Sequence, residues 1–167
     1  PENFNVYYAG WDHGGSVPQS GASIYNPLAC VKKVAFFDSP ATTDTVVETN
    51  TLCWKTYWNG GILEPGASGA PLFDQNNRLI GHLVDGEQTC DSATTQPTFA
   101  SKFSENWDGL TPATRLRDWL DPADTAMTLD GFDPNMAPVP TVRVRLKALL
   151  QGPYLSGTGM MNATLND

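Results

Sequence analysis

Several features that mark common classes of protein are missing from this sequence. No apolar stretch approaches the roughly 20 residues that a membrane-spanning helix needs. Acidic side chains outnumber basic ones by 18 to 10, and the resulting net charge of −8 argues against a general nucleic-acid binder, which needs a basic face. There is no Cys-x-x-Cys pair, and the two histidines, His13 and His82, lie far apart, so we expect neither a metal site nor a cofactor.

Cysteines are few in this sequence. Of the three cysteines, Cys30, Cys53 and Cys90, two could pair and leave the third for a partner outside the chain. The alternative is free buried thiols, because buried cysteine behaves as a small hydrophobic residue.

The sequence begins at Pro1 without an initiator Met or a basic-then-apolar leader, so we expect a fragment or a processed chain.

Glycine and proline are frequent and spread along the chain, which favours many short strands joined by turns. Alternating or continuous apolar residues predict strands near 4–8, 23–25, 34–37, 52–58 and 79–84. The polar residues 74–78 predict a hairpin turn before the last of these strands. At 167 residues the chain can bury one core and has some length left for a second module.

One helix is expected late in the chain. Thr111 can cap it and Pro112 suits its first turn. Leu116, Trp119 and Leu120 then lie on one face. The helix should end before Pro122, because the residue preceding a proline disfavours the helical region.

Composition changes after Asp130, where prolines become frequent. The predicted organisation is a domain at 1–132, a proline-rich linker at 133–141 and the start of an incomplete β module at 142–167. Apolar and basic residues alternate over 142–147, which predicts a strand with one solvated face rather than a nucleic-acid site. Residues 142–154 resemble the opening of a β module in large secreted bacterial proteins, which implies a multidomain exported protein.

Six residues, Gly66-Ala67-Ser68-Gly69-Ala70-Pro71, carry most of the chemical information. A serine nucleophile needs exposure, a base that takes its proton, and donors for the oxyanion. Small neighbours leave the Ser68 hydroxyl exposed, and the backbone N–H groups of Gly66 and Ser68 are candidate oxyanion donors. The α/β-hydrolase signature Gly-x-Ser-x-Gly is not met, because position 70 is Ala and no helix follows. A turn made of small residues is the alternative interpretation.

Blocks on both sides of this loop favour catalysis. Trp54-Lys55-Thr56-Tyr57-Trp58 precedes it, and Leu79-Ile80-Gly81-His82-Leu83-Val84-Asp85-Gly86 follows it. Tyr7-Tyr8-Ala9-Gly10-Trp11-Asp12 and Leu116–Pro122 lie further out. In this order the blocks resemble the C-terminal barrel of chymotrypsin-like serine endopeptidases of the secreted bacterial lysyl endopeptidase branch, over residues 4–132. The resemblance implies an all-β fold, a chymotrypsin-like antiparallel six-stranded β-barrel with a short C-terminal helix.

The resemblance also implies roles for single residues. Ser68 is the nucleophile that forms the acyl-enzyme, and the N–H groups of Gly66 and Ser68 form the oxyanion hole. Val84-Asp85-Gly86 is the strand edge that holds the substrate backbone extended. Ile62 and Leu63 are apolar candidates for the primary pocket. The implied substrate is a polypeptide, and the implied location is outside the cell or on its surface.

The sequence departs from the family where catalysis is concerned. The family's catalytic His and Asp lie in an N-terminal barrel upstream of the matched blocks, so we expect them to be missing from this chain. His13 in a Gly-rich loop and His82 in a strand are expected to be structural. Because serine without a base is a poor nucleophile, the chain alone is expected to be inactive.

Specificity departs from the family as well. The lysyl branch places an acidic residue in the pocket shortly before the next strand, but the corresponding residues 96–100 contain none. Position 84, which is a His in that branch, is Val. A desolvated carboxylate is what binds the ammonium group of a lysine tightly, so we expect no selection for lysine. Asp85 or Glu87 could partly substitute for the missing acidic residue.

The resemblance bears on the cysteines too. Cys90 matches a cysteine that pairs far upstream in the branch, which implies a partner in the N-terminal half. A disulfide between Cys30 and Cys53 is then a hypothesis that uses the odd number. The N-terminal protease half, or other domains of the same protein, are the implied protein partners.

Two functions from different classes follow. In the first, the chain is part of a secreted serine endopeptidase that hydrolyses peptide bonds through an acyl-enzyme on Ser68. In the second, it is a non-catalytic module of protease ancestry with a binding or structural role in a large bacterial secreted or cell-surface protein. The ordered blocks favour the first function, and the absent base and specificity residue favour the second.

Overall fold

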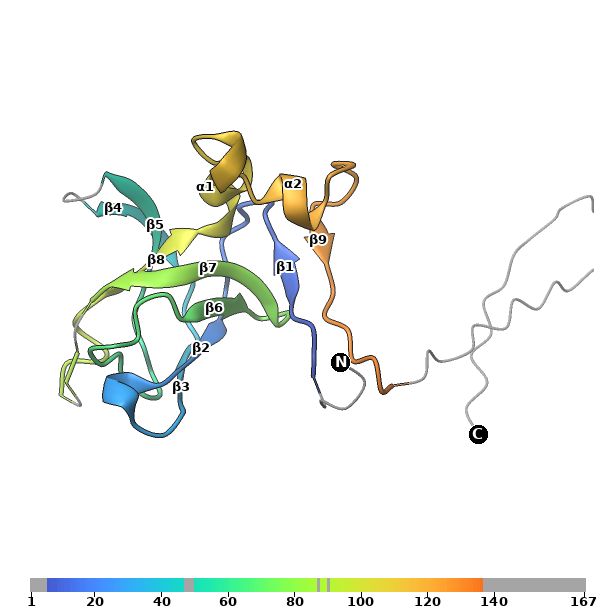
Figure 1. Ribbon diagram of the computed structural model, residues 1–167. Helices are drawn as coiled ribbons and strands as arrows, with labels where there is room; N and C mark the ends of the chain where they lie inside the picture. The colour runs from blue at the N-terminus through green and yellow to red at the C-terminus, as the bar shows by residue number, and fades with distance from the viewer. Residues whose placement is uncertain (1–5, 47–49, 87, 90, 137–167) are drawn as a thin grey trace, which may run out of the picture. The chain divides into compact units, whose positions relative to one another are not determined.

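The computed structural model describes residues 6–46, 50–86, 88, 89 and 91–136. These residues form nine strands with a few short helices between them (Figure 1). The strands are β1 (Gly10–Asp12), β2 (Gly21–Tyr25), β3 (Lys33–Phe37), β4 (Thr42–Val46), β5 (Thr51–Thr56), β6 (Pro71–Asp74), β7 (Arg78–Asp85), β8 (Thr98–Lys102) and β9 (Thr128–Leu129). The α-helices are α1 (Phe103–Asp108) and α2 (Arg117–Leu120), and the 3₁₀ turns are η1 (Pro27–Ala29) and η2 (Pro112–Thr114).

All of these elements belong to a compact unit that ends at Asp133. The predicted linker at 133–141 and the predicted β module at 142–167 extend beyond Met136, the last described residue. The organisation into a domain, a linker and a second module therefore stays a prediction.

The strands form one mostly antiparallel sheet in the order β3-β2-β6-β7-β8-β5-β4. To one side, β1 pairs in parallel with β7, and β9 pairs with β1. The sheet curls into a barrel-like shape (Figure 1), but among the described residues its edge strands β3 and β4 do not pair with each other. An isolated bridge between Phe36 of β3 and Gly60 links the segment after β5 to the opposite edge.

The all-β prediction is confirmed, with one difference in closure. The sheet is not closed into the predicted six-stranded barrel, because the chain beyond β5 becomes irregular at Gly60 and Gly61. Gly61 has a φ of +77°, which is incompatible with a continuing strand. The ladder from this segment to β3 is therefore limited to the bridge at Phe36.

Most of the predicted strands are confirmed. Those near 23–25, 34–37, 52–58 and 79–84 correspond to β2, β3, β5 and β7. The strand expected near 4–8 falls partly outside the described residues, and β1 begins only at Gly10.

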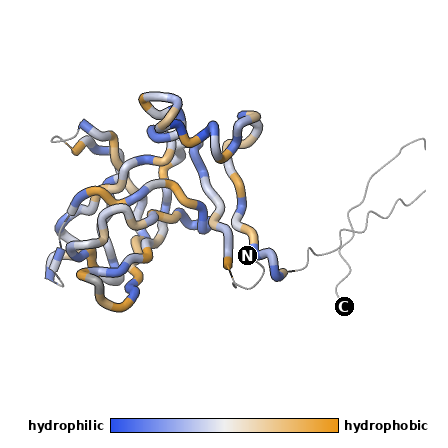
Figure 2. The backbone as a smooth tube through the Cα atoms, in the orientation of Figure 1, coloured by the Kyte–Doolittle hydropathy of each residue, from blue (hydrophilic) through white to orange (hydrophobic). Residues whose placement is uncertain are grey.

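The inward side of the sheet holds the main hydrophobic core. Trp54 and Trp58 are 2% and 0% exposed and belong to the same cluster as Leu72 and Leu83. The buried indole N–H of Trp58 donates to Thr98 Oγ1 at 2.8 Å, so no polar group is left unpaired on that ring. Figure 2 shows hydrophobic and hydrophilic residues following each other along the sheet strands, as expected for strands with one buried side.

A second, smaller cluster lies beside α1, a helix that the sequence did not predict. Trp11 of β1 is buried with Phe103 and Trp107 of α1. The Trp107 ring stacks on His13, with ring centroids 3.9 Å apart and planes inclined by 5°. α1 is only six residues long and has no side-chain cap hydrogen bond. Because no local signal marks its start, aromatic packing is what stabilises it.

The single helix expected between Thr111 and Pro122 is broken in two. η2 and α2 are separated at Arg115, whose backbone is extended with φ −84° and ψ 115°. The Thr114 hydroxyl accepts the N–H of Thr111 at 3.1 Å and closes the first turn on itself. Of the residues expected on one helical face, Trp119 is 79% exposed. The short C-terminal helix implied by the resemblance is present as α2.

The predicted hairpin turn between β6 and β7 is confirmed, and Asp74 organises it. Asp74 is 6% exposed, and its Oδ1 accepts the backbone N–H groups of Asn76 and Arg78 at 2.9 and 2.8 Å. Its Oδ2 accepts the Asn76 side-chain amide at 3.1 Å. Asn77 adopts a φ of +59°, a left-handed conformation that asparagine tolerates better than most residues.

Candidate active site

Ser68 lies in the loop that leads into β6, and its neighbours fix this loop to the sheet. The N–H of Ala70 donates to Ala67 O at 3.0 Å. The N–H of Gly69 donates to Leu83 O at 2.7 Å, and the N–H of Leu83 donates to Ala70 O at 2.8 Å. The position of Ser68 is therefore set by β7 and by the hydrogen bonds of adjacent residues.

Two backbone donors of this loop are unpaired. The N–H of Ala67 donates to Glu64 O at 3.2 Å, whereas those of Gly66 and Ser68 donate to no acceptor among the described residues. Ser68 is exposed, and its hydroxyl makes no hydrogen bond within the same part of the chain. Backbone donors that are fixed in place and free to bond are what stabilises a developing oxyanion.

Two glycines give the loop its shape. Gly66 and Gly69 have φ values of +92° and +83°, which L side chains rarely adopt. A Cβ at Gly66 would lie 3.0 Å from Leu28 N, whereas a Cβ at Gly69 would meet nothing within 4 Å. Gly66 is therefore required by conformation and by packing, and Gly69 borders open space next to Ser68.

A cavity of about 170 Å³ opens beside Ser68. Its walls are two segments that are distant in sequence, 63–68 and 83–86. The structure thus brings together most of the residues selected from the sequence, namely Leu63, Gly66, Ser68, Val84, Asp85 and Gly86. The hydrogen bonds between the Ser68 loop and Leu83 hold the two walls next to each other.

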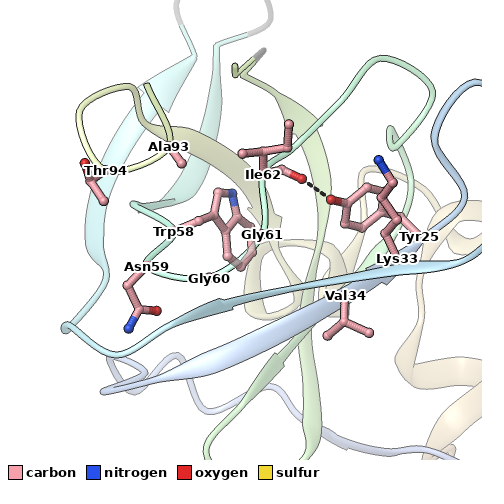
Figure 3. Close-up of a pocket in the computed structure, with 10 residues that line it drawn as sticks. All are labelled: Tyr25, Lys33, Val34, Trp58, Asn59, Gly60, Gly61, Ile62, Ala93 and Thr94. Atoms are coloured by element: carbon pink, nitrogen blue, oxygen red, sulfur yellow. Dashed lines mark hydrogen bonds between the residues drawn. The ribbon is translucent and has the colours of Figure 1, made fainter. Parts of the chain in front are cut away.

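Ile62, the remaining residue selected from the sequence, lines a different cavity of about 580 Å³ (Figure 3). Its backbone carbonyl accepts a hydrogen bond from the hydroxyl of Tyr25, as Figure 3 shows. Burial raises the pKa of Tyr25. Lys33 and Trp58 also line this second cavity. The structure therefore separates Ile62 from the other candidate pocket residues.

Two acidic residues line the Ser68 cavity, and they differ in their partners. Glu64 Oε2 lies 2.6 Å from Lys33 Nζ, and this hydrogen bond raises the pKa of Lys33. Asp85 is exposed, and its carboxylate accepts the N–H of Gly86 at 2.7 Å. The charge of Glu64 is thus offset by a cation, while that of Asp85 lies in solvent.

One edge of β7 lies open beside the Ser68 loop. The pairing of β7 with β6 ends at His82, opposite Pro71, whereas its pairing with β8 continues to Asp85, opposite Phe99. Among the described residues, no strand pairs with Val84–Gly86 on the side of β6. A strand edge of this kind can accept an extended peptide through main-chain hydrogen bonds.

Gln88 is a site residue that sequence reasoning missed. It is 6% exposed and holds Leu63 at two points. Its N–H donates to Leu63 O at 3.1 Å, and its Oε1 accepts the Leu63 N–H at 3.1 Å. Its amide nitrogen donates to Ala93 O and Gln96 O. No local pattern marks a glutamine whose partner lies 25 residues away.

Neither histidine bonds to Ser68 within the described residues. His13 Nε2 lies 3.0 Å from Ala126 O, and its ring stacks on Trp107. His82 is exposed on β7, opposite Pro71, and partial burial of its ring lowers its pKa. His13 is therefore hydrogen-bonded and packed, as a structural histidine would be.

The hypothesis of a disulfide between Cys30 and Cys53 is wrong, because both are free thiols. Cys30 follows η1 and is exposed, whereas Cys53 is buried in β5. Cys53 faces Asp44 of β4 and Ser101 of β8 across the sheet, and burial raises the pKa of its thiol. Cys90 lies outside the described residues.

In the part of the chain that the structure describes, no group of three His, Cys, Asp or Glu side chains is placed to hold a metal ion. No helix there is both long and apolar enough to cross a membrane. The basic strand expected at 142–147 lies outside this part.

A comparison with known protein families adds a finding that is independent of the geometry. The family model for the lysyl endopeptidase C-terminal domain matches residues 1–100. This match covers more than half of the chain and includes the Ser68 loop, both walls of its cavity and the open edge of β7. It stops within β8, so α1 and α2 lie beyond it.

Proposed function

The chain belongs to the lysyl endopeptidase C-terminal domain family, and we propose that it is the part of a secreted serine endopeptidase that carries the nucleophile. In this proposal Ser68 attacks the carbonyl of a peptide bond and forms an acyl-enzyme. The observation that carries the proposal is the pair of unpaired N–H groups, those of Gly66 and Ser68, beside an exposed serine hydroxyl.

The two N–H groups are proposed to form the oxyanion hole. They lie in a loop that is anchored to β7 through Leu83, so they need no rearrangement when negative charge develops on the carbonyl oxygen. Preorganised donors of this kind contribute about 10²–10³-fold each to the rate of acyl transfer. Gly66 supports this role, because only glycine readily adopts its φ of +92°.

The open edge of β7 is proposed to hold the substrate. An extended peptide that pairs with Val84–Gly86 would lie along the wall of the Ser68 cavity opposite the Ser68 loop. Main-chain pairing fixes the peptide in extended form and brings its scissile carbonyl to the serine. One side chain of the substrate would then enter the cavity.

The proton acceptor for Ser68 is proposed to come from an N-terminal region of the same protease. The His13 ring is occupied by Trp107 and Ala126 O, and His82 lies on an exposed strand position. A His–Asp pair supplied by the N-terminal region would take the serine proton and return it to the leaving amine. That region is thus the proposed protein partner, and the proposed location is outside the cell.

A fluorophosphonate probe tests the proposal, because it reacts with activated serines. We expect the full-length protein to be labelled stoichiometrically and the Ser68→Ala variant to remain unlabelled. Ser39→Ala is a matched control, since Ser39 is exposed like Ser68 and does not line the cavity, and it should label normally. Full-length protein that is folded by circular dichroism but takes up no label would contradict the proposal.

A non-catalytic peptide-binding module is the second candidate. The observation that favours it is that neither histidine of the described residues contacts Ser68. Such a module would use the same β7 edge and cavity to bind an extended peptide without cleaving it. Peptide binding by full-length protein that takes up no fluorophosphonate would identify this function.

A further inference from the structure

We propose that Leu28 is a positioning residue for the oxyanion hole. Its backbone N–H holds the peptide plane between Pro65 and Gly66 in the orientation that leaves the Gly66 N–H free for the substrate. This inference rests on the proposed function, because it assigns a positioning residue to the same site. Three observations carry it: the hydrogen bond from Leu28 to Pro65, the turn that contains Gly66, and the left-handed conformation of Leu28.

The hydrogen bond fixes a whole peptide plane. The N–H of Leu28, in η1 between β2 and β3, donates to Pro65 O at 3.2 Å. The C=O of Pro65 and the N–H of Gly66 belong to the same planar trans peptide group, so they point in opposite directions. Because the carbonyl faces Leu28, the Gly66 N–H faces away from it and meets no acceptor among the described residues. Leu28 thus sets the direction of an oxyanion donor from outside the lining of the Ser68 cavity.

The turn that contains Gly66 does not fix this orientation by itself. The N–H of Ala67 donates to Glu64 O at 3.2 Å and closes a four-residue turn, in which Pro65 is second and Gly66, with φ +92°, is third. This is the pattern of a type II β-turn. A type I turn has its central peptide plane rotated but keeps the same closing hydrogen bond, and glycine can adopt the φ of either type. The Pro65 oxygen faces Leu28 in the type II orientation, so the bond from Leu28 selects that orientation.

Leu28 has an unfavourable backbone conformation. Its φ and ψ are 45° and 36°, a left-handed conformation that leucine rarely adopts. Its side chain is 67% exposed, so burial does not account for this conformation. The turn is held by the N–H of Cys30, which donates to Pro27 O at 2.7 Å. A Cβ at Gly66 would lie 3.0 Å from Leu28 N, so the two backbones are in close contact. Strained residues of this kind persist where their surroundings fix them, and they cluster at functional sites.

An amide-to-ester substitution at Leu28 of the full-length protein tests the inference. The α-hydroxy acid analogue of leucine replaces the N–H by an oxygen and keeps the side chain. We expect kcat for a peptide substrate to fall about tenfold, the effect of losing one typical hydrogen bond, and less than the roughly 10²–10³-fold cost of removing an oxyanion donor outright. KM should change by less than about twofold, because the donor acts in the transition state.

The same substitution at Val31 is the matched control. Val31 lies in the same connection between β2 and β3, is 78% exposed, and its N–H donates to no backbone acceptor among the described residues. Its ester should leave both kcat and KM unchanged. Circular dichroism of each variant establishes that it is folded.

A double-mutant cycle with Gly66→Ala separates positioning from a general structural role. Alanine does not readily adopt φ +92°, so Gly66→Ala favours the rotated peptide plane and should itself lower kcat. If Leu28 acts through this plane, its ester should lower kcat little further in the Gly66→Ala background. Losses that multiply would overturn the inference, and the single ester is decisive by itself if Gly66→Ala does not fold.

The outcomes distinguish the inference from the proposed function. A folded Leu28 ester whose kcat stays within about twofold of the unaltered protein, or whose KM rises instead, would overturn the inference. It would leave the proposed function intact, provided that the unaltered protein hydrolyses the peptide and takes up the fluorophosphonate. Folded, unaltered full-length protein that does neither would overturn the proposed function itself, and this inference with it.

Discussion

The two loops at the ends of β6 use their backbone donors in opposite ways. At its start, the Ser68 loop leaves the N–H groups of Gly66 and Ser68 without acceptors among the described residues. At its end, the Asp74 turn gives the N–H groups of Asn76 and Arg78 a shared carboxylate oxygen at 2.9 and 2.8 Å. Both loops contain left-handed residues, so backbone conformation alone does not distinguish them.

Side-chain chemistry accounts for the difference. The Asp74 turn consists of Asp, Gln and Asn residues, which carry their own acceptors and close the turn locally. The Ser68 loop consists mainly of Gly, Ala and Pro, which carry none. Two of its donors, the N–H groups of Gly66 and Ser68, find no acceptor among the described residues, and a substrate carbonyl oxygen is an acceptor of the right kind. The Asp74 turn therefore stabilises the fold, whereas the Ser68 loop keeps two backbone donors available for a ligand.

The largest effect is expected from Ser68→Ala. Peptidase activity of the full-length protein should fall by about 10⁴-fold or more, because the variant has no nucleophile. Stability should stay within about 0.5 kcal/mol of the unaltered protein, since Ser68 is exposed and its hydroxyl is unbonded within the described residues. Hydrolysis of a casein or peptide substrate, with a thermal melt on the same sample, measures both. Substantial residual activity would assign the chemistry to another residue.

Asp74→Ala should show the reverse pattern. It removes a buried carboxylate that accepts three hydrogen bonds, and we expect a loss of about 1–3 kcal/mol in the free energy of unfolding. Urea unfolding measures this loss. Asp74→Asn keeps one side-chain acceptor oxygen and should cost less. Activity per folded molecule should be retained in both variants, and selective loss of activity would contradict a purely structural role for this turn.

Substitutions of the left-handed residues Gly69 and Asn77 should change stability by smaller amounts. Gly69→Ala places a Cβ on a backbone with φ +83°, which costs about 1–2 kcal/mol, although the Cβ itself meets no neighbour within 4 Å. Asn77→Gly in the Asp74 turn should change stability by less than about 1 kcal/mol, because glycine adopts φ +59° readily. Chemical denaturation of both variants tests this. Equal stability of Gly69→Ala and the unaltered protein would mean that the Ser68 loop adapts to the substitution.

The smallest effects on stability are expected from the ion pair near each loop. Lys33–Glu64 precedes the Ser68 loop, and Arg78–Asp130 lies at the Asp74 turn, each with a shortest N–O distance of 2.6 Å. Both pairs are partly exposed, so Lys33→Met and Asp130→Asn should lower the melting temperature only slightly, and less in high salt. A large, salt-independent drop in either variant would show that its pair contributes through packing instead.

The residue types of the Asp74 turn were sufficient to predict that turn, whereas those of the Ser68 loop did not predict the geometry around it. The Asp74 turn depends on side chains that bond their own backbone, so it can be read from Asp and Asn residues alone. The walls of the Ser68 cavity join segments 63–68 and 83–86, and only the resemblance to a known family placed them together. The position of Ile62 could not be predicted in this way. It follows two glycines, so the alternation of side chains along a strand does not tell which side its side chain faces.

Long-range packing accounts for the remaining differences. α1 is held by stacking of Trp107 on His13 and by a tilted contact of Trp107 with Trp11, and both partners are distant in sequence. Trp119 fitted a helical face with Leu116, yet only Leu116 packs against the aromatic cluster. Gln88 accepts a hydrogen bond from the N–H of Leu63. No sequence motif around Gln88 predicts this contact. Each of these features depends on where distant segments meet, which one sequence does not specify.

We propose that the two unpaired backbone donors beside Ser68, the N–H groups of Gly66 and Ser68, belong to a nucleophile loop. The most direct measurement is peptide mapping by mass spectrometry of full-length protein treated with a fluorophosphonate. We expect one phosphonyl group per molecule, located on the peptide that contains Ser68, and none after heat denaturation before treatment. Folded protein without an adduct, or an adduct located on a different serine, would contradict it.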